Sequence, residues 1–371
     1  MRRLQVIVIM LFCLVTGSYA QNVTLTVHGQ AATKETAITQ ALRSAIEQAY
    51  GVFVSANTEL VNGKLTKDEI VTVSSGNIQS YKEMACASLP NGDVTVTLSA
   101  TVSIDNLVAY AKSHGSRAEF AGKTLAMNMK MIKINKDNEL SALGHLLVQL
   151  RELVPHMFDH KLYVGDVPVK DGGYYKLPMT VVVQSNEASD AFYKLLKGTL
   201  QSLSLNGSEE YHYKSMKLPY YHVGMNLIEN TVYGYTHPEY ELRNDPSMLV
   251  RQIGDLINKS VTSFVLEKNG NISGNASFSL ENDGIMARVE HMEVVVPNSV
   301  KYYHSDWEDW EGEAIQCNKF DLFTAKIKTK KKKGVVHKTV IPQLVCKLHG
   351  NIYIKPSELD KITGFELVRR R

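Results

Sequence analysis

Apolar residues near the start of the chain follow two different periods. Val23, Leu25 and Val27 alternate with polar neighbours, which is typical of a strand with one buried face. From Lys34 to Tyr50 the period changes, because alanines recur at every fourth position and form one smooth stripe on a helix. These alanines are Ala37, Ala41, Ala45 and Ala49. The pattern predicts a strand followed by a helix that lies close against a sheet and ends at Gly51.

Two strands and a short helix complete this first segment. Asn77–Ala87 and Val94–Val102 alternate as strands, and Pro90-Asn91-Gly92-Asp93 between them is typical of a hairpin turn. A helix is predicted over Ile104–Lys112. Together these elements predict a small α+β module over residues 21–115.

The ordered combination of these features resembles a family of bacterial envelope domains. The strand ends at Gly29, the alanine-spaced helix follows, and Gly76–Tyr81 precedes the hairpin that ends in Val94–Ser103. Over residues 22–113 this order resembles the amino-terminal domain of flagellar assembly protein T and related bacterial envelope proteins. The resemblance implies a small α+β domain, an envelope location and a binding or assembly role, and nothing in the rest of the chain requires a flagellum.

The second segment, residues 120–225, is predicted to begin with a strand and a helix. Asp137 or Asn138 is expected to cap this helix, which stops before Pro155. Its predicted apolar face consists of Leu140, Leu143, Leu147 and Leu150. A hairpin that turns at Asp171-Gly172-Gly173 and a second helix follow, so we expect another α+β module.

The third segment, residues 226–371, has one clear helix and then several strands. Asp245 is expected to cap the helix, and Pro246 suits its first turn. Alternating runs follow at Ile285–Val296, Phe320–Lys328 and Val335–Val345. We therefore expect a third α+β module that is rich in antiparallel strand, and an α+β fold class for a chain of tandem small modules.

The amino end has the three parts of a cleavable secretion signal. Arg2 and Arg3 form a charged start, Val6–Val15 is apolar, and Ser18-Tyr19-Ala20 has the small-x-small pattern of a cleavage site. The apolar run is shorter than the roughly 20 residues of a permanent membrane helix. We expect residues 1–20 to be a signal peptide, with cleavage between Ala20 and Gln21 and export to the bacterial periplasm or envelope.

Composition and motifs exclude several classes of function. The chain has 371 residues and a formal net charge of +3, so no overall field favours nucleic acid. Beyond the amino end, no apolar stretch reaches membrane length, and no phosphate loop, nucleophile elbow or cofactor motif is found. The expected function is therefore a non-catalytic envelope protein without a cofactor, which binds protein partners.

One histidine cluster has the spacing of metal ligands. His156, Asp159 and His160 would share a face if the turn after Pro155 were helical, and two imidazoles with a carboxylate suit a transition metal. Pro155 interrupts the helix, however, and the sequence places no fourth ligand. Polar groups in water are the better interpretation, and no metal site is predicted.

An aromatic and acidic segment supports an alternative function. Trp307 and Trp310 lie near Tyr302 and Tyr303 and among carboxylates, a combination that sugar-binding clefts use. The carboxylates are Asp306, Glu308, Asp309 and Glu311. Carboxylates so close in sequence usually decorate a loop, which favours glycan binding over hydrolysis. The alternative is a secreted carbohydrate-binding or carbohydrate-degrading protein.

The densest charge in the chain is a run of lysines. Lys328 and Lys330–Lys333 lie between two strand patterns and are interpreted as a solvated hairpin tip that discourages edge pairing. Contact with phosphates of nucleic acid or lipid is the alternative.

Export makes a disulfide chemically accessible to the three cysteines of the mature chain. Cys317 and Cys346 both lie in the third segment and are the expected pair, which leaves Cys86 free. The bridge requires the two Cα atoms to lie within about 7 Å of each other.

Overall fold

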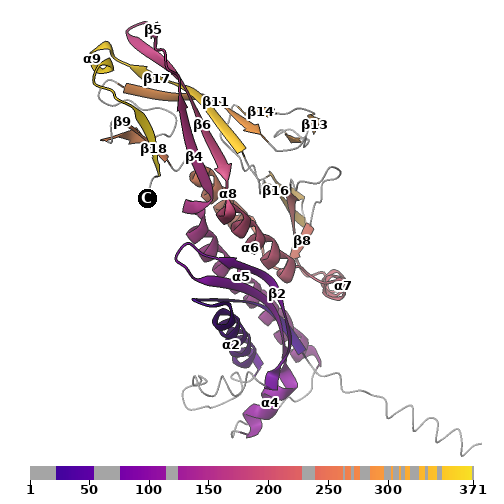
Figure 1. Ribbon diagram of the computed structural model, residues 1–371. Helices are drawn as coiled ribbons and strands as arrows, with labels where there is room; N and C mark the ends of the chain where they lie inside the picture. Colours follow the sequence, from indigo (N-terminus) through magenta and orange to yellow (C-terminus); the bar gives the residue numbers. More distant parts are fainter. Residues whose placement is uncertain are drawn as a thin grey trace, which may run out of the picture.

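A computed structural model arranges helices and antiparallel sheets along one long axis (Figure 1). The longer described ranges are 22–53, 76–113, 124–227, 239–261 and 345–369. Further strands are described at 264–268, 271–275, 285–295, 302–303, 309–310, 314–317, 326–330 and 333–340. The expected α+β class is confirmed by this mixture of helices and mainly antiparallel sheets.

The first module contains the predicted elements in the predicted order. They are β1 (Asn22–Ala31), α2 (Lys34–Phe53), β2 (Ile78–Ser88), β3 (Val94–Ser103) and α4 (Ile104–Ser113). The strands form an antiparallel sheet in the order β1-β3-β2, and Gly92 in the hairpin turn has a φ of 91°. The helix α2 continues past Gly51, so the prediction that the helix ends at Gly51 was wrong. The additional turn buries Phe53.

The alanine stripe of α2 lies directly on the sheet, as the sequence predicts. All four alanines are fully buried against Val23, Leu25 and Val27 of β1 and the apolar face of β3. Gly29 marks the closest approach, because a Cβ there would lie 1.9 Å from the carbonyl oxygen of Ala37. Only a glycine allows the helix backbone to come this near to the strand.

The opposite, polar face of the same sheet is also buried. Two helices, α5 (Thr124–Leu153) and α6 (Glu187–Leu203), pack against it. Thr26, Thr95 and Thr97 are almost completely inaccessible to solvent. Their hydroxyls lie within hydrogen-bonding distance of other polar groups: Ser202 Oγ at 2.7 Å from Thr26, the carbonyl of Gly29 at 3.3 Å from Thr95, and His28 Nδ1 at 3.0 Å from Thr97.

Asn138 makes the most specific contact between α5 and this sheet. Its side-chain Oδ1 accepts a hydrogen bond from the backbone N–H of Thr26 at 2.9 Å, and its Nδ2 donates to the carbonyl of Thr26 at 2.9 Å. The same Nδ2 donates to Gln48 Oε1 on α2 at 2.8 Å. The amide thus pairs with the outer edge of β1 as a neighbouring strand would.

The structure corrects two predictions about the second segment. Asn138 lies in the middle of α5 and does not cap it, and residues from Thr124 onward are helical where a strand was expected. The helix reaches two cores, because Ile134 in its first half is buried in the first and Leu146 and Leu150 near its end are buried in a second. Leu140, expected on the apolar face, is 57% exposed.

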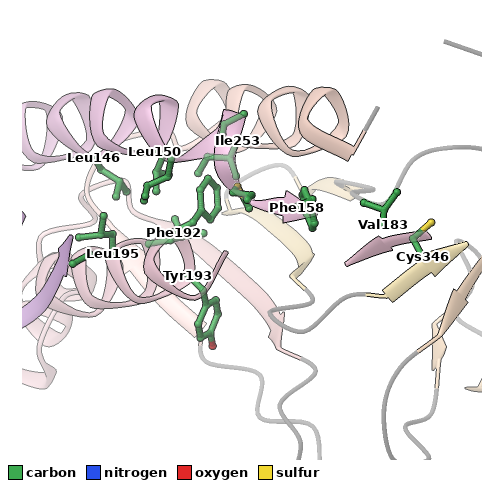
Figure 2. Close-up of a cluster of buried hydrophobic side chains, with 14 of the residues drawn as sticks. Leu146, Leu150, Phe158, Val183, Phe192, Tyr193, Leu195, Ile253 and Cys346 are labelled. Carbon is green, nitrogen blue, oxygen red and sulfur yellow. The ribbon is translucent and has the colours of Figure 1, made fainter. Parts of the chain in front are cut away.

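The second core lies between three helices and a large sheet. Figure 2 shows Leu146 and Leu150 of α5 on one side and Phe192 and Leu195 of α6 on the other, with Ile253 of α8 (Ser247–Val261) beside them. Asp245 caps α8 as predicted, since its Oδ1 accepts from the backbone N–H of Ser247 at 2.9 Å. Further along, Val183 and Cys346 project from neighbouring strands into the same cluster.

The large sheet combines strands from the second and third segments. Its strands are β4 (Phe158–Val164), β5 (Val169–Asp171), β6 (Tyr174–Ser185), β11 (Ile285–Val295), β14 (Ala314–Cys317) and β17 (Val345–Ile354). The order is β14-β11-β17-β6-β4, and β5 also pairs with β6. The strand β17, near the carboxyl end of the chain, therefore lies between β11 and β6, so the 120–225 and 226–371 segments share one sheet.

Smaller elements complete the fold. They are a 3-10 turn (Val154–His156), α7 (Gly207–Ser215), β7 (Tyr221–Leu227), β8 (Glu239–Leu242), β9 (Phe264–Lys268), β10 (Asn271–Asn275), β12 (Tyr302–Tyr303), β13 (Asp309–Trp310), β15 (Lys326–Lys330), β16 (Lys333–Val340), α9 (Pro356–Leu359) and β18 (Phe365–Arg369). One four-stranded sheet has the order β15-β16-β7-β8, with β16 parallel to β7. Among the described helices, none is long and apolar enough to cross a bilayer.

Two glycines on the long helices provide a matched test of the packing against the first module. At Gly198 on α6, a Cβ would lie 2.5 Å from the carbonyl oxygen of Met84 on β2, whereas at Gly144 on α5 a Cβ meets no atom within 4 Å. We expect Gly198→Ala to lower the free energy of unfolding by about 1–3 kcal/mol. Gly144→Ala should raise it by up to about 1 kcal/mol through helix propensity. Urea unfolding of both variants checks the two signs, and equal effects would contradict the close contact.

The buried His28 makes stability depend on pH. Burial, and then the neighbouring His145 whose ring centroid lies 5.9 Å away, lower the pKa of His28 to about 3. In the unfolded chain this pKa is about 6.5, so below that pH only the unfolded state takes up the proton. Stability should therefore fall by on the order of 1 kcal/mol per pH unit as the pH drops from about 6 to 4.

The variant His28→Asn isolates this effect. It removes the titrating ring, so its stability should fall less steeply with pH than that of the wild type. The exposed His156, replaced by Asn, is the matched control and should leave the slope unchanged. Denaturant unfolding at several pH values measures the three slopes, and identical slopes would show that His28 does not contribute.

Candidate binding surface

One face of the six-stranded sheet points away from the hydrophobic core. On β6 the core-facing residues are Leu177, Met179, Val181 and Val183, all buried. The residues that alternate with them face the other way and are exposed or half-buried. They are Lys176, Pro178, Thr180, Val182 and Gln184. We call the surface formed by these residues and their partners on β4, β11 and β17 the outer face.

The strand register arranges the described residues of the outer face in five rows. The first contains Asp159, Gln184 and Val345, the second contains Lys161, Val182 and Lys347, and the third contains Tyr163, Thr180 and His349. The fourth contains Pro178, Asn351 and Arg288, and the fifth contains Val169, Lys176 and Tyr353. Cationic, aromatic and hydrogen-bonding residues thus share this face of the sheet.

Side chains within the outer face hold each other in place. Glu290 Oε1 accepts a hydrogen bond from Asn351 Nδ2 at 2.7 Å, and the hydroxyl of Tyr353 lies 3.5 Å from the same oxygen. The ammonium group of Lys176 lies 5.8 Å from the centroid of the Tyr353 ring, within the range of a cation–π contact. Thr180 Oγ1 lies 3.1 Å from His349 Nδ1. The arrangement is a preformed set of donors, acceptors and one aromatic ring.

The margin of this sheet carries apolar side chains in solvent. Tyr163 is 59% exposed, Val167 is 73% exposed and Val169 is 62% exposed. Tyr163 lies on β4, Val169 lies on β5, and Val167 lies between the two strands. In the order of the sheet, β4 is the last strand. In Figure 1 this segment, residues 163–169 and here called the distal edge, lies at the end of the molecule opposite α4. Clustered exposed apolar residues often mark a contact with a partner.

A buried charge network elsewhere has a structural role. Arg243 contacts both Glu139 and Glu209, with Nη1 3.2 Å from Glu139 Oε2 and Nη2 2.7 Å from Glu209 Oε1. Burial raises the pKa of Glu139, although Arg243 partly offsets this effect. Burial acts against the charge of Arg243, but Glu209 and Glu139 outweigh it and raise the pKa of Arg243. The network joins α5, α7 and the residues after β8. Its charged groups pair with one another.

The proposed helical face for metal ligands does not form. His156 ends a 3-10 turn, and Asp159 and His160 are successive residues of β4, whose side chains point to opposite sides. Asp159 Oδ1 instead accepts a hydrogen bond from Asn186 Nδ2 at 3.1 Å. Across the part of the chain that the structure describes, no group of three potential ligands is arranged for a metal.

The expected Cys317–Cys346 bridge is contradicted by the strand order. Cys346 on β17 is a free, buried cysteine, and Cys317 lies on β14 on the far side of β11. Two strand spacings separate these strands, about 10 Å, which exceeds the Cα separation that a disulfide spans. The third cysteine, Cys86, is free as expected and half-buried.

The other candidate residues are described in part or not at all. The signal peptide with Ala20 and Gln21 lies outside the described residues, as does Trp307. Trp310 on β13 pairs in register with Tyr302 on β12. The lysine run lies where β15 and β16 pair as an antiparallel hairpin, with Lys330 opposite Lys333, which agrees with the expected hairpin.

The outer face was not found from the sequence, although part of its signal was readable. In Val345–Ile354 the buried Cys346, Leu348, Ile352 and Ile354 alternate with polar or aromatic residues, as in a strand with two different faces. Nothing in that alternation shows that the strand inserts between β11 and β6. The face exists only because three distant segments come together.

Comparison with protein-family models, curated proteins and solved structures gives no match for this chain. The outer face and the distal edge are therefore interpreted from their own geometry and chemistry.

The strand order predicts the state of the cysteines. Peptide mapping of the native protein under non-reducing conditions should yield Cys346 as a free thiol, and no peptide linked through Cys317 and Cys346. Because Cys346 is fully buried, a thiol reagent should label it slowly until denaturant is added. Cys86 is half-buried and should react earlier, which makes it the internal control. A linked peptide would contradict the arrangement of β11, β14 and β17.

Proposed function

We propose that this chain is an exported, non-catalytic protein of a bacterial envelope that binds protein partners or helps to assemble a larger structure. The observation that carries the proposal is the distal edge, with Tyr163, Val167 and Val169 exposed together at one end of the molecule. Burying one such side chain in an interface contributes about 1.5–3 kcal/mol. Three such side chains within one short segment favour a contact with a partner.

The elongated shape supports a role in assembly. The first module lies at one end, the distal edge lies at the other, and α5 and α6 connect the two (Figure 1). The resemblance of the first module to the amino-terminal domain of flagellar assembly protein T, together with the apparent secretion signal, supports an envelope location. A molecule of this shape can contact different partners at its two ends.

Carbohydrate binding is the second candidate function. It is supported by the pairing of Tyr302 with Trp310, which brings two aromatic positions together next to carboxylates in the sequence. Binding to a glycan array that is lost in Trp307→Ala or Trp310→Ala would favour this function over a protein partner.

Site-specific photo-crosslinking in the native envelope tests the proposed protein contact. A photoreactive residue at position 167 should give a discrete crosslinked product, because Val167 is the most exposed member of the distal edge. The matched control is position 47 on α2, where Glu47 is exposed but lacks apolar neighbours of this kind. Val169→Lys should reduce the product from position 167 several-fold, since a charge would enter an apolar contact.

The result depends on the comparison between the two positions. Crosslinks of equal yield from positions 167 and 47 would indicate random collision and would contradict the proposal. So would a product from position 167 that Val169→Lys leaves unchanged.

A further inference from the structure

We infer that the outer face binds an acidic polysaccharide, meaning a glycan that carries carboxylates along its chain. This inference rests on the proposed export and concerns a surface that adjoins the distal edge and shares Tyr163 and Val169 with it. Its basis is the combination of charge, aromatic rings and hydroxyl-binding groups on one open sheet face.

The dimensions of the outer face suit a polymer. Lys176 and Val182 are six residues apart on β6, which corresponds to about 20 Å along the strand. The four strands from β4 to β11 span about 14 Å across. The cationic residues are distributed over this area and do not converge on one point, so they do not form a pocket for a single small anion.

The charge of the outer face favours an anion. Its described residues include the cations Lys161, Lys176, Lys347 and Arg288, against the carboxylates of Asp159 and of the adjacent Glu290. Lys161 and Arg288 are exposed on opposite sides of the half-buried centre. The positive charges outnumber the negative ones, which attracts an anionic chain.

The uncharged groups distinguish a glycan from a nucleic acid. The half-buried Thr180 and His349 are donors or acceptors suited to sugar hydroxyls, and the exposed carboxylate of Glu290 can accept hydrogen bonds from hydroxyls. A phosphate diester has no hydrogen to donate to this carboxylate and is repelled by it. Tyr163, which is 59% exposed, offers a ring face against which the apolar side of a sugar ring can pack, and the Tyr353 ring positions the ammonium group of Lys176.

Titration of the exported chain, from Gln21 onward, with polygalacturonate oligomers tests this inference. The wild type should bind, and binding should weaken as salt is raised, because the contact is partly electrostatic. The double variant K161Q/R288Q should weaken binding about tenfold or more, and Tyr353→Ala should also weaken it. The matched control K82Q/K194Q removes two exposed lysines on β2 and α6 and should bind as the wild type does.

Two further ligands define the chemistry. Methyl-esterified polygalacturonate has the same sugars without the charge and should bind at least about tenfold more weakly. Single-stranded DNA of matched charge should bind more weakly than the polyuronate. Thermal unfolding of every variant confirms that the fold is retained.

Several results would overturn the inference: no saturable binding of polygalacturonate, equal binding by K161Q/R288Q and the wild type, or tighter binding of DNA. The protein contact at the distal edge is measured independently by crosslinking from position 167. Loss of polyuronate binding with a retained crosslink would therefore remove this inference and leave the proposed function in place. Loss of the crosslink with retained polyuronate binding would contradict the proposed protein contact and leave this inference in place.

Discussion

The architecture depends on how the open edge of β1 is closed. The side-chain amide of Asn138 donates to and accepts from the backbone of Thr26, so a residue of α5 replaces the strand that would otherwise pair there. A buried backbone group without a partner costs about 1–3 kcal/mol, which makes this contact selective for one position of the helix. It fixes α5 against the first module, and α5 then continues into the second core through Leu146 and Leu150.

The buried polar face of the first sheet follows from that arrangement. Thr95, Thr97 and Thr26 are covered by α5 and α6, and their hydroxyls lie beside other polar groups at the interface. Hydrogen bonds between the sheet and the helices require one position of the helices along the sheet, whereas purely apolar contacts would allow several. His28 lies in the same layer, and its lowered pKa reflects the removal of the ring from water. The first module is thereby held in one orientation, with the distal edge at the far end of the molecule.

The outer face results from the position of β17. This strand, near the carboxyl end, lies between β11 and β6, so the outer face includes residues from three distant parts of the sequence. Its aromatic, cationic and amide side chains become neighbours only in the finished sheet. The same insertion places β11 between Cys317 and Cys346 and prevents the expected disulfide. A protein contact at the edge and a glycan contact on the face would allow one sheet to join two kinds of envelope component.

The sequence alone determined the elements whose signals are local. The alanine period of α2, the turn at Gly92 and the cap at Asp245 each depend on residues a few positions apart, and each was predictable. Asn138 was mistaken for a cap because its polar side chain suits a helix start equally well, and only Thr26, 112 residues earlier in the chain, shows what it binds. Likewise, alternation in Val345–Ile354 indicates a strand but not its neighbours. The tertiary structure decided the strand order, the shared sheet and the outer face, because contacts between distant segments leave no period in the sequence.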